Sequence, residues 1–206
     1  MPDNRSLTGE TGAASVAVIV LAAGFGSRFG DGDKLGALLA GKPVAHHILS
    51  TLQSFDWARK ILVCRSNAGW AEAFQNDGFS IVHNDDAGQG MLGSLRAGVL
   101  AAGDRLRTLI CLADMPLVSG EHILRLLSVA EQEDDWVIAS TADTYRGPPA
   151  IFPVGALMQL PSRGEGGARS LLTNALFVDC DIAQLMDIDT QPDLQIAESR
   201  LPPVSG

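Results

Sequence analysis

The sequence predicts an α/β fold built on a mostly parallel sheet. Short runs rich in valine, isoleucine and leucine recur along the chain, at 16–21, 60–64, 79–84 and 107–114. Continuous apolar runs of this length are typical of strands that are covered on both faces. Helical patterns lie between them, and alternating strands and helices favour a doubly wound sheet with right-handed crossovers.

The run VAVIVL (16–21) is expected to be the first core strand. The leader before it holds one arginine against two acidic residues, so it lacks the positive region of a signal peptide. The apolar segment 13–23 is too short to span a bilayer. We expect residues 1–14 to form a flexible tail and residues 15–200 a single domain, because no linker is long enough to separate two domains.

Three stretches with helical spacing are expected to cover the sheet. The segment 42–55 has Pro43 near its first turn and repeats apolar residues every three or four positions. The segments 93–103 and 119–133 also show a helical pattern, and Ser119 is placed as the N-cap of the last one.

After residue 136 the pattern changes. Strand-like runs at 136–141, 150–153 and 175–180 are separated by irregular stretches rich in glycine and proline, at 145–150 and 161–169. We expect this half of the chain to hold mixed strands and loops that extend the same sheet and cover its active edge.

The composition is that of a globular, acidic protein. Hydrophobic residues make up 46% and charged residues 19%, and the formal net charge is -9 at pH 7. Broad nucleic-acid binding needs a cationic face, so no nucleic-acid partner is expected, and the polar leader gives no reason to expect a membrane partner. A compact anionic ligand remains open, because its site needs only local cations and backbone N–H groups.

The three cysteines, Cys64, Cys111 and Cys180, are far apart and have no metal-ligand spacing. This pattern argues against a zinc site and against a disulfide framework. It fits a reducing compartment, and we expect a cytoplasmic location.

A glycine-rich loop follows the first strand, in the stretch VIVLAAGFGSRFGDGDK (18–34). Open α/β sheets bind ligands at the carboxyl ends of their strands, so a phosphate is expected here. The stretch matches neither the dinucleotide fingerprint GxGxxG nor the P-loop pattern GxxxxGK[ST]. Its own pattern is AAGxGSRxG followed by DK. Backbone N–H groups of 22–26 can approach a phosphate, and Arg28 and Lys34 add charge. From these residues alone, a tight turn with two solvated cations is an open alternative.

Acidic residues are the second candidate group. Asp114 ends a hydrophobic run. A carboxylate at this position can ligate Mg²⁺ that bridges triphosphate oxygens. The alternative is that Asp114 serves only as a helix cap or turn residue. Asp187 and Asp189 are two residues apart, so they share one face if their segment is a strand. A solvated pair at the edge of the sheet is the alternative for these two.

Several motifs together resemble a known family. LAAGFGSRFG, DK and GKPV resemble the signature LAAGxSxRMG…K…GKP of nucleotidyltransferases, and GQGMLGSLRAG, LADMPLV, GEGGARSLL and DIDTQPDL match in the same order. The set is most similar to the molybdenum-cofactor nucleotidyltransferases, especially their cytidylyltransferase branch, and covers about residues 16–195. The resemblance implies a three-layer, Rossmann-like, mostly parallel sheet of the nucleotide-diphospho-sugar transferase type.

The resemblance also implies site residues. Arg28, Lys34 and Asp114 would be catalytic, and Asp114 and Asp189 would hold Mg²⁺, with Asp187 as a further candidate. The implied nucleotide-binding residues are Leu21, Ala22, Ala23, Gly24, Gly26, Ser27, Arg28, Lys34, Asn84, Gly90 and Ser94. The implied acceptor-binding residues are Arg146, Gly166, Gly167 and Arg169. Ser94 as a plain N-cap, and the glycine-rich stretch as a simple helix entry, remain alternatives.

The reaction implied by the resemblance is attack by a terminal phosphate oxygen of an acceptor on the α-phosphorus of a nucleoside triphosphate. Pyrophosphate leaves, and such chemistry depends on positioning and charge neutralisation. We favour CTP as the donor, with GTP as the alternative. The implied acceptor is molybdopterin, and a molybdoenzyme that receives the product is implied as a client.

Pro148 stands where histidine is common in relatives. This departure keeps open a nucleotidyltransferase for a sugar or polyol phosphate. The other alternative is a non-catalytic nucleotide-binding module or molybdenum-cofactor chaperone, and the joint presence of Arg28, Lys34 and Asp114 argues against it.

Overall fold

The computed structural model describes residues 12–24, 28–30, 32–86, 90–103, 107–161, 164 and 166–201. Within them, one sheet has seven strands in the order β5-β4-β1-β6-β8-β7-β9. These strands are β5 Ser80–His83, β4 Arg59–Cys64, β1 Val16–Ala22, β6 Arg107–Leu112, β8 Tyr145–Phe152, β7 Ile138–Ala142 and β9 Leu176–Asp179. β1 is parallel to β4 and β6, β4 to β5, and β7 to β9, whereas β8 is antiparallel to β6 and β7.

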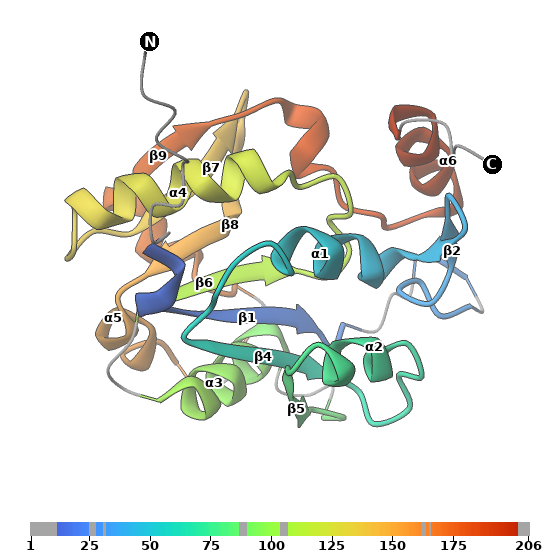
Figure 1. Cartoon of the computed structure of the whole chain (residues 1–206), viewed down its shortest axis with the longest axis horizontal. Helices are drawn as coiled ribbons and strands as arrows, with labels where there is room; N and C mark the ends of the chain where they lie inside the picture. Colours follow the sequence, from blue (N-terminus) through green and yellow to red (C-terminus); the bar gives the residue numbers. More distant parts are fainter. Residues whose placement is uncertain are drawn as a thin grey trace, which may run out of the picture.

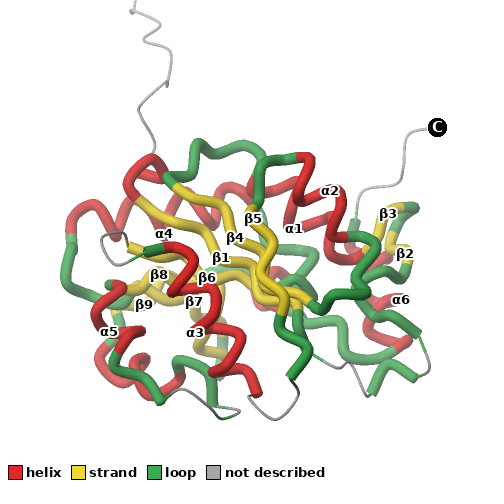
Figure 2. The backbone as a smooth tube through the Cα atoms, turned by 90° about the horizontal axis from the view of Figure 1, so that it is seen from below, coloured by secondary structure: helices red, strands yellow, loops and turns green. Residues whose placement is uncertain are grey.

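Helices cover both faces of this sheet. They are α1 Val44–Leu52, α2 Ala71–Asn76, α3 Gly90–Ala102, α4 Gly120–Gln132 and α5 Val154–Met158, whereas α6 Gln191–Arg200 lies beside residues 38–39 (Figure 1). Shorter elements are the 3-10 helices η1 Gly12–Ser15, η3 Arg169–Asn174 and η4 Ile182–Leu185, and the hairpin of β2 Leu38–Leu39 and β3 Lys42–Pro43. Figure 1 shows α1 and α4 on one side of the sheet and α3 and α5 on the other. Figure 2 views the molecule from the side of α3 and α5.

The central strand β1 explains the layers. All seven of its residues are buried, and they alternate between two clusters. Val18 and Val20 pack with residues of α1, α2 and α4, whereas Ala17 and Ile19 pack with residues of α3 and α5. Each fully buried valine or isoleucine side chain contributes about 1.5–3 kcal/mol. α3 lies so close to β1 that a Cβ atom at Gly98 would meet Ile19 Cγ2 at 2.7 Å, so glycine permits this approach.

A buried polar network joins α4 to β7 and β8. The Ser140 hydroxyl donates to the Pro149 carbonyl oxygen at 2.6 Å, so the His122 Nε2–H donates to Ser140 Oγ at 2.7 Å. His122 Nδ1 finds no hydrogen-bond partner among the residues described. Burial, helped by the charge of Arg125, lowers the pKa of His122 to about 4. His122 is therefore a neutral structural residue at neutral pH.

The predicted α/β class and mostly parallel sheet are confirmed, and the second half of the chain extends the sheet through β7, β8 and β9. The run 107–114 is a strand only to Leu112, so Asp114 lies in the turn after it. The condition that Asp187 and Asp189 lie in a strand is not met, because 186–189 has no regular secondary structure.

Two further features concern the ends of the chain and its helices. η1 overlaps the last three residues of the segment 1–14 that is expected to be a tail, and its residue Ala13 is fully buried. In the part of the chain that the structure describes, no helix combines the length and apolarity needed to cross a membrane.

Candidate active site

Two strand ends meet at the carboxyl edge of the sheet. β1 and β6 are parallel neighbours, and their hydrogen bonding continues past β6, because the Ala113 amide donates to the Leu21 carbonyl oxygen at 3.0 Å. Asp114 therefore follows at the edge where the glycine loop begins. A third segment joins them, since the Ile188 amide donates to the Asp114 carbonyl oxygen at 2.9 Å. The Ile188 side chain is fully buried, which anchors the segment that carries the neighbouring carboxylates.

Lys34 connects two of these carboxylates. Its Nζ donates to Asp114 Oδ2 at 2.7 Å and to Asp189 Oδ1 at 3.2 Å, and its side chain is only 11% exposed. Burial alone would lower the pKa of Lys34, but the charges of Asp114 and Asp189 and their hydrogen bonds outweigh it and raise the pKa. Lys34 is therefore a fixed positive charge between residues that are 80 and 155 positions away in the sequence.

Arg28 completes the group from the glycine loop. Its Nη1 lies 2.8 Å from Asp189 Oδ2, but its side chain is 77% exposed. An ion pair with so exposed a partner contributes only about 0–1 kcal/mol, so its guanidinium can exchange this contact for an anionic ligand. The structure thus brings together Arg28, Lys34, Asp114 and Asp189, the residues that the sequence singled out for triphosphate and metal binding.

Negative charge exceeds positive charge around these residues. Burial raises the pKa of Asp187 to about 6, and the charges of Asp114 and Asp189 add to the shift. Carboxylate oxygens are hard ligands that suit Mg²⁺, which commonly takes one or two carboxylates and completes its coordination with water and substrate phosphates. Among the described residues, no group of three His, Cys, Asp or Glu side chains could hold a metal by itself. This donor set fits a magnesium ion shared with a phosphorylated ligand.

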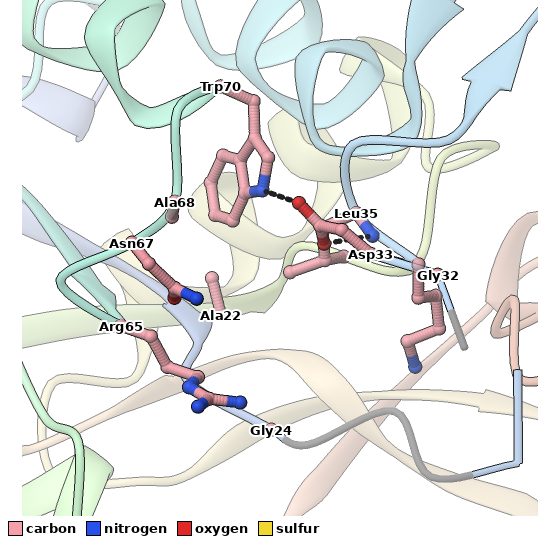
Figure 3. Close-up of a pocket in the computed structure, with 10 residues that line it drawn as sticks. Ala22, Gly24, Gly32, Asp33, Leu35, Arg65, Asn67, Ala68 and Trp70 are labelled. Atoms are coloured by element: carbon pink, nitrogen blue, oxygen red, sulfur yellow. Dashed lines mark hydrogen bonds between the residues drawn. The ribbon is translucent and has the colours of Figure 1, made fainter. Parts of the chain in front are cut away.

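A pocket of about 270 Å³ opens beside this group (Figure 3). It lies between the end of β1, the turn at 32–35 and the segment that connects β4 to α2. Figure 3 shows the Trp70 indole pointing toward Asp33, with Arg65 and Gly24 across the pocket from them. The lining residues are Ala22, Gly24, Gly32, Asp33, Lys34, Leu35, Arg65, Asn67, Ala68 and Trp70. Because Lys34 also reaches Asp114, the pocket and the carboxylates form one continuous site.

Sequence reasoning missed the wall formed by Arg65, Asn67 and Trp70. These residues follow β4 in the stretch CRSNAGW, which has no glycine-loop or acidic motif. A signal was present, because β4 is the other parallel neighbour of β1 and its carboxyl end lies at the same edge. If the carboxyl end of every expected strand had been considered as a ligand site, this segment would have been included.

Apart from Arg28, which pairs with Asp189, the predicted nucleotide-binding residues fall into three sets. Ala22, Gly24 and Lys34 line the pocket, and Leu21 and Ala23 flank Ala22 at the end of β1. Gly26 and Ser27 lie outside the described residues. Asn84, Gly90 and Ser94 are not among the pocket-lining residues that the structure describes.

Asn84 and Ser94 form a contact of their own. Asn84 Nδ2 donates to Ser94 Oγ at 2.9 Å, and the Asn84 amide donates to the Cys64 carbonyl oxygen at 2.9 Å. Ser94 is the fifth residue of α3, which begins at Gly90, so it is not the N-cap of that helix. The pair links the end of β5 to the first turns of α3, next to the carboxyl end of β4.

The predicted acceptor-side residues lie on β8, just before η3 and at its first residue. The Arg146 guanidinium stacks over the Phe177 ring at 4.8 Å. Gly166 and Gly167 lead into η3, which begins at Arg169, so the stretch is also a helix entry. A Cβ atom at Gly167 would meet Met91 Sδ at 2.8 Å, so this loop packs against the start of α3. The expected acceptor loop and the start of α3 are therefore neighbours.

Tyr145 connects Pro148 on β8 to Met115, in the turn after β6. Its hydroxyl donates to the Pro148 carbonyl oxygen at 2.7 Å. Burial raises the pKa of Tyr145 well above its usual value, and the charges of Asp187 and Asp114 add to the shift. Pro148 is thus held by a side chain whose hydroxyl lies 4.0 Å from the Sδ of Met115, the residue after Asp114.

Comparison with known proteins identifies relatives for this geometry. The family described as MobA-like NTP transferase domain matches residues 18–180. The nicotine blue oxidoreductase of Paenarthrobacter nicotinovorans is 28% identical over 198 residues, which cover 92% of this chain and 97% of that protein.

Two solved structures share the fold. The Rv0371c protein of Mycobacterium tuberculosis, in complex with manganese, has a TM-score of 0.69 at 22% identity and covers 91% of this chain and 100% of its own. The molybdopterin-guanine dinucleotide biosynthesis protein A of Archaeoglobus fulgidus has a TM-score of 0.65 at 20% identity, covering 89% of this chain and 97% of its own.

Proposed function

This chain belongs to the MobA-like NTP transferase domain family, and we propose that it transfers a nucleoside monophosphate to a phosphorylated acceptor. The donor is a nucleoside triphosphate, with CTP favoured over GTP, and the acceptor is molybdopterin. One observation carries the proposal: Lys34 binds Asp114 and Asp189 at the edge of the sheet, beside Arg28 and an open pocket. This arrangement supplies cations for phosphates and carboxylates for a metal in one place.

The residues divide the work of the reaction. A terminal phosphate oxygen of the acceptor forms a bond to the α-phosphorus, and the bond from that phosphorus to the bridging oxygen of pyrophosphate breaks. Arg28 and Lys34 neutralise the charge that accumulates on the leaving pyrophosphate. Asp114 and Asp189 would hold a magnesium ion, which would supply charge neutralisation at the phosphates. The nucleoside enters the pocket beside Trp70, Arg65 and Asn67.

The acceptor approaches from the side of β8 and η3. Arg146 and Arg169 offer positive charge there, and Gly166 and Gly167 offer backbone N–H groups to a phosphate. The motif resemblance supports molybdopterin, and so does the shared fold with the Archaeoglobus fulgidus protein named for molybdopterin-guanine dinucleotide biosynthesis. A sugar or polyol phosphate is the alternative acceptor, because Pro148 offers no side-chain donor where histidine is common.

A second candidate activity comes from one relative. The similarity to nicotine blue oxidoreductase extends over nearly the whole of both chains, which favours an oxidoreductase acting on an organic substrate as the competing function. Such an enzyme would not need a metal-bound triphosphate, so its activity would survive loss of Asp114. Nucleotidyl transfer would not.

The test is pyrophosphate release with Mg²⁺ and CTP, GTP, ATP or UTP, each against molybdopterin and simple sugar phosphates. We expect acceptor-dependent release that Asp114→Asn lowers by about 100-fold or more and that Asp56→Asn leaves intact. Asp56 is exposed and lies in the connection before β4, at the opposite edge of the sheet, so it controls for the chemical change. Absence of release with every pair, together with oxidation of a pyridine nucleotide in the presence of nicotine blue, would establish the competing function instead.

A further inference from the structure

We propose that Trp70 is a positioning residue for the reaction: by donating its indole N–H to Asp33, it holds the adjacent Lys34 on Asp114 and Asp189. The inference rests on the proposed function, because it gives Trp70 a part in that reaction. It assigns to the β4–α2 segment a role beyond lining the pocket.

The first step is the way Asp33 is held. Trp70 Nε1 donates to Asp33 Oδ2 at 2.9 Å, and the Leu35 amide donates to Asp33 Oδ1 at 3.1 Å (Figure 3). Both carboxylate oxygens are therefore in use, one by the wall of the pocket and one by the turn itself. The Asp33 carbonyl oxygen also accepts from the Ala37 amide at 3.0 Å. These contacts fix the backbone on both sides of Lys34.

The second step is that consecutive residues serve different parts of the site. Asp33 binds Trp70 at the pocket, whereas the Nζ of Lys34 binds Asp114 and Asp189. A lysine side chain has four rotatable bonds, so its ammonium group reaches a fixed point only if its backbone is fixed. The link from Trp70 to Asp33 supplies that restraint, and a displacement of about 1 Å is enough to weaken catalysis strongly.

The third step is that Trp70 is itself immobilised. The Trp70 carbonyl oxygen accepts from His46 Nε2 at 2.9 Å, so α1 holds its backbone. Its ring packs edge-on against that of Phe74, with 6.0 Å between the ring centroids, and the residue as a whole is 9% exposed. A Cβ atom at Gly36 would meet Asp33 Oδ2 at 2.7 Å and Trp70 Cδ1 at 3.3 Å, so glycine leaves the space in which indole and carboxylate meet.

Simple core packing is the competing explanation for Trp70. Trp57 offers a matched control, because it is buried to the same degree and its Nε1 donates to the Leu52 carbonyl oxygen at 2.9 Å. Trp57 lies before β4, away from the carboxyl edge. Trp70→Phe and Trp57→Phe each remove one indole donor and keep an aromatic ring. Only the first breaks the link to Lys34.

Asp33→Asn supplies a second variant that leaves the aromatic core intact. An asparagine can accept from the Leu35 amide or from the Trp70 indole, but its amide nitrogen then faces the other donor. The variant therefore breaks the same link from the other end. It keeps the inference testable if Trp70→Phe does not fold.

The experiment measures the reactivity of Lys34 toward an amine-labelling reagent by peptide mass spectrometry. Lys60, which lies 2.9 Å from Asp77, is the internal reference. We expect the ratio of Lys34 labelling to Lys60 labelling to rise about tenfold in Trp70→Phe and in Asp33→Asn. This factor corresponds to the loss of about one charge-assisted hydrogen bond. In Trp57→Phe the ratio should stay unchanged. An unchanged ratio in both of the first two variants would overturn the inference.

Kinetics add a second readout. In pyrophosphate release, we expect kcat/KM for the nucleotide to fall about tenfold in Trp70→Phe and in Asp33→Asn, with no further loss in the double variant, because both break one link. Equal losses in Trp70→Phe and Trp57→Phe would identify a packing effect and count against the inference. If the wild-type protein releases no pyrophosphate, the proposed function fails, whereas the labelling ratio still decides whether Trp70 positions Lys34.

Discussion

Replacing Lys34 by methionine removes the cation between Asp114 and Asp189. Loss of one partner from a buried pair costs about 3–5 kcal/mol. Here the side chains of Asp114 and Asp189 are 22% and 34% exposed, so solvent screens part of their repulsion. We therefore expect a loss of about 2–3 kcal/mol, which lowers the melting temperature by about 5–10 °C in a chain of this size.

Magnesium should restore much of this stability. In Lys34→Met the two carboxylates no longer share an ammonium group, and a divalent ion that binds only the folded state at about 100 times its Kd adds about 2.7 kcal/mol. The wild-type protein should gain less, because the ion must compete with Lys34. Thermal melts with and without MgCl₂, at matched ionic strength, measure both effects.

The matched control is Lys60→Met. Lys60 pairs with Asp77 at 2.9 Å, and its side chain is 23% exposed against 11% for Lys34, but it is remote from the site. We expect this variant to lose stability without recovering it in magnesium, and Asp114→Asn to cancel the recovery of Lys34→Met. Equal recovery in the Lys34 and Lys60 variants, or none in the first, would refute the assignment of Asp114 and Asp189 to a metal.

Three further predictions concern single residues. Asp114→Asn should lower turnover in pyrophosphate release by about 100-fold or more. Circular dichroism should show that the variant still folds. Turnover equal to that of the wild-type protein would show that Asp114 is not a metal ligand. Arg28→Ala should raise the KM for the triphosphate about tenfold without changing the melting temperature, because the side chain is 77% exposed, and unaltered kinetics would contradict its role. The pKa of His122 falls from 6.5 to about 4 on folding, so the unfolded chain binds the proton first as the pH decreases. The free energy of unfolding should therefore decrease between these two pH values, by about 3 kcal/mol in total, and denaturant unfolding of His122→Gln should lack this dependence; an identical slope in both proteins would argue against a neutral His122.

The central sheet was predictable because its strands leave a strong pattern. The residues of β1 pack on both faces, so burial selects a continuous run of apolar residues that contrasts with the polar segments around it. The meeting of Lys34 and Asp114 was predictable for a related reason. Both follow strands that are parallel neighbours, and the carboxyl ends of such strands share an edge.

The contacts that refine the site left no comparable pattern. Trp70 meets Asp33 because α2 begins beside the turn at 32–35. Asp33 belongs to the DK motif, but Trp70 belongs to no motif, so no pattern in the sequence indicates this contact. Asp187 and Asp189 flank a buried Ile188 in a segment without regular structure, and a strand-based argument cannot describe them. Their position depends on the hydrogen bond from Ile188 to Asp114, a tertiary contact between residues far apart in the chain.

The most direct measurement is a crystal structure with Mg²⁺ and a non-hydrolysable analogue of CTP. We expect the nucleoside in the pocket beside Trp70, the phosphates against Arg28 and Lys34, and the metal on Asp114. A nucleotide bound elsewhere, or a metal that does not touch Asp114, would contradict the account.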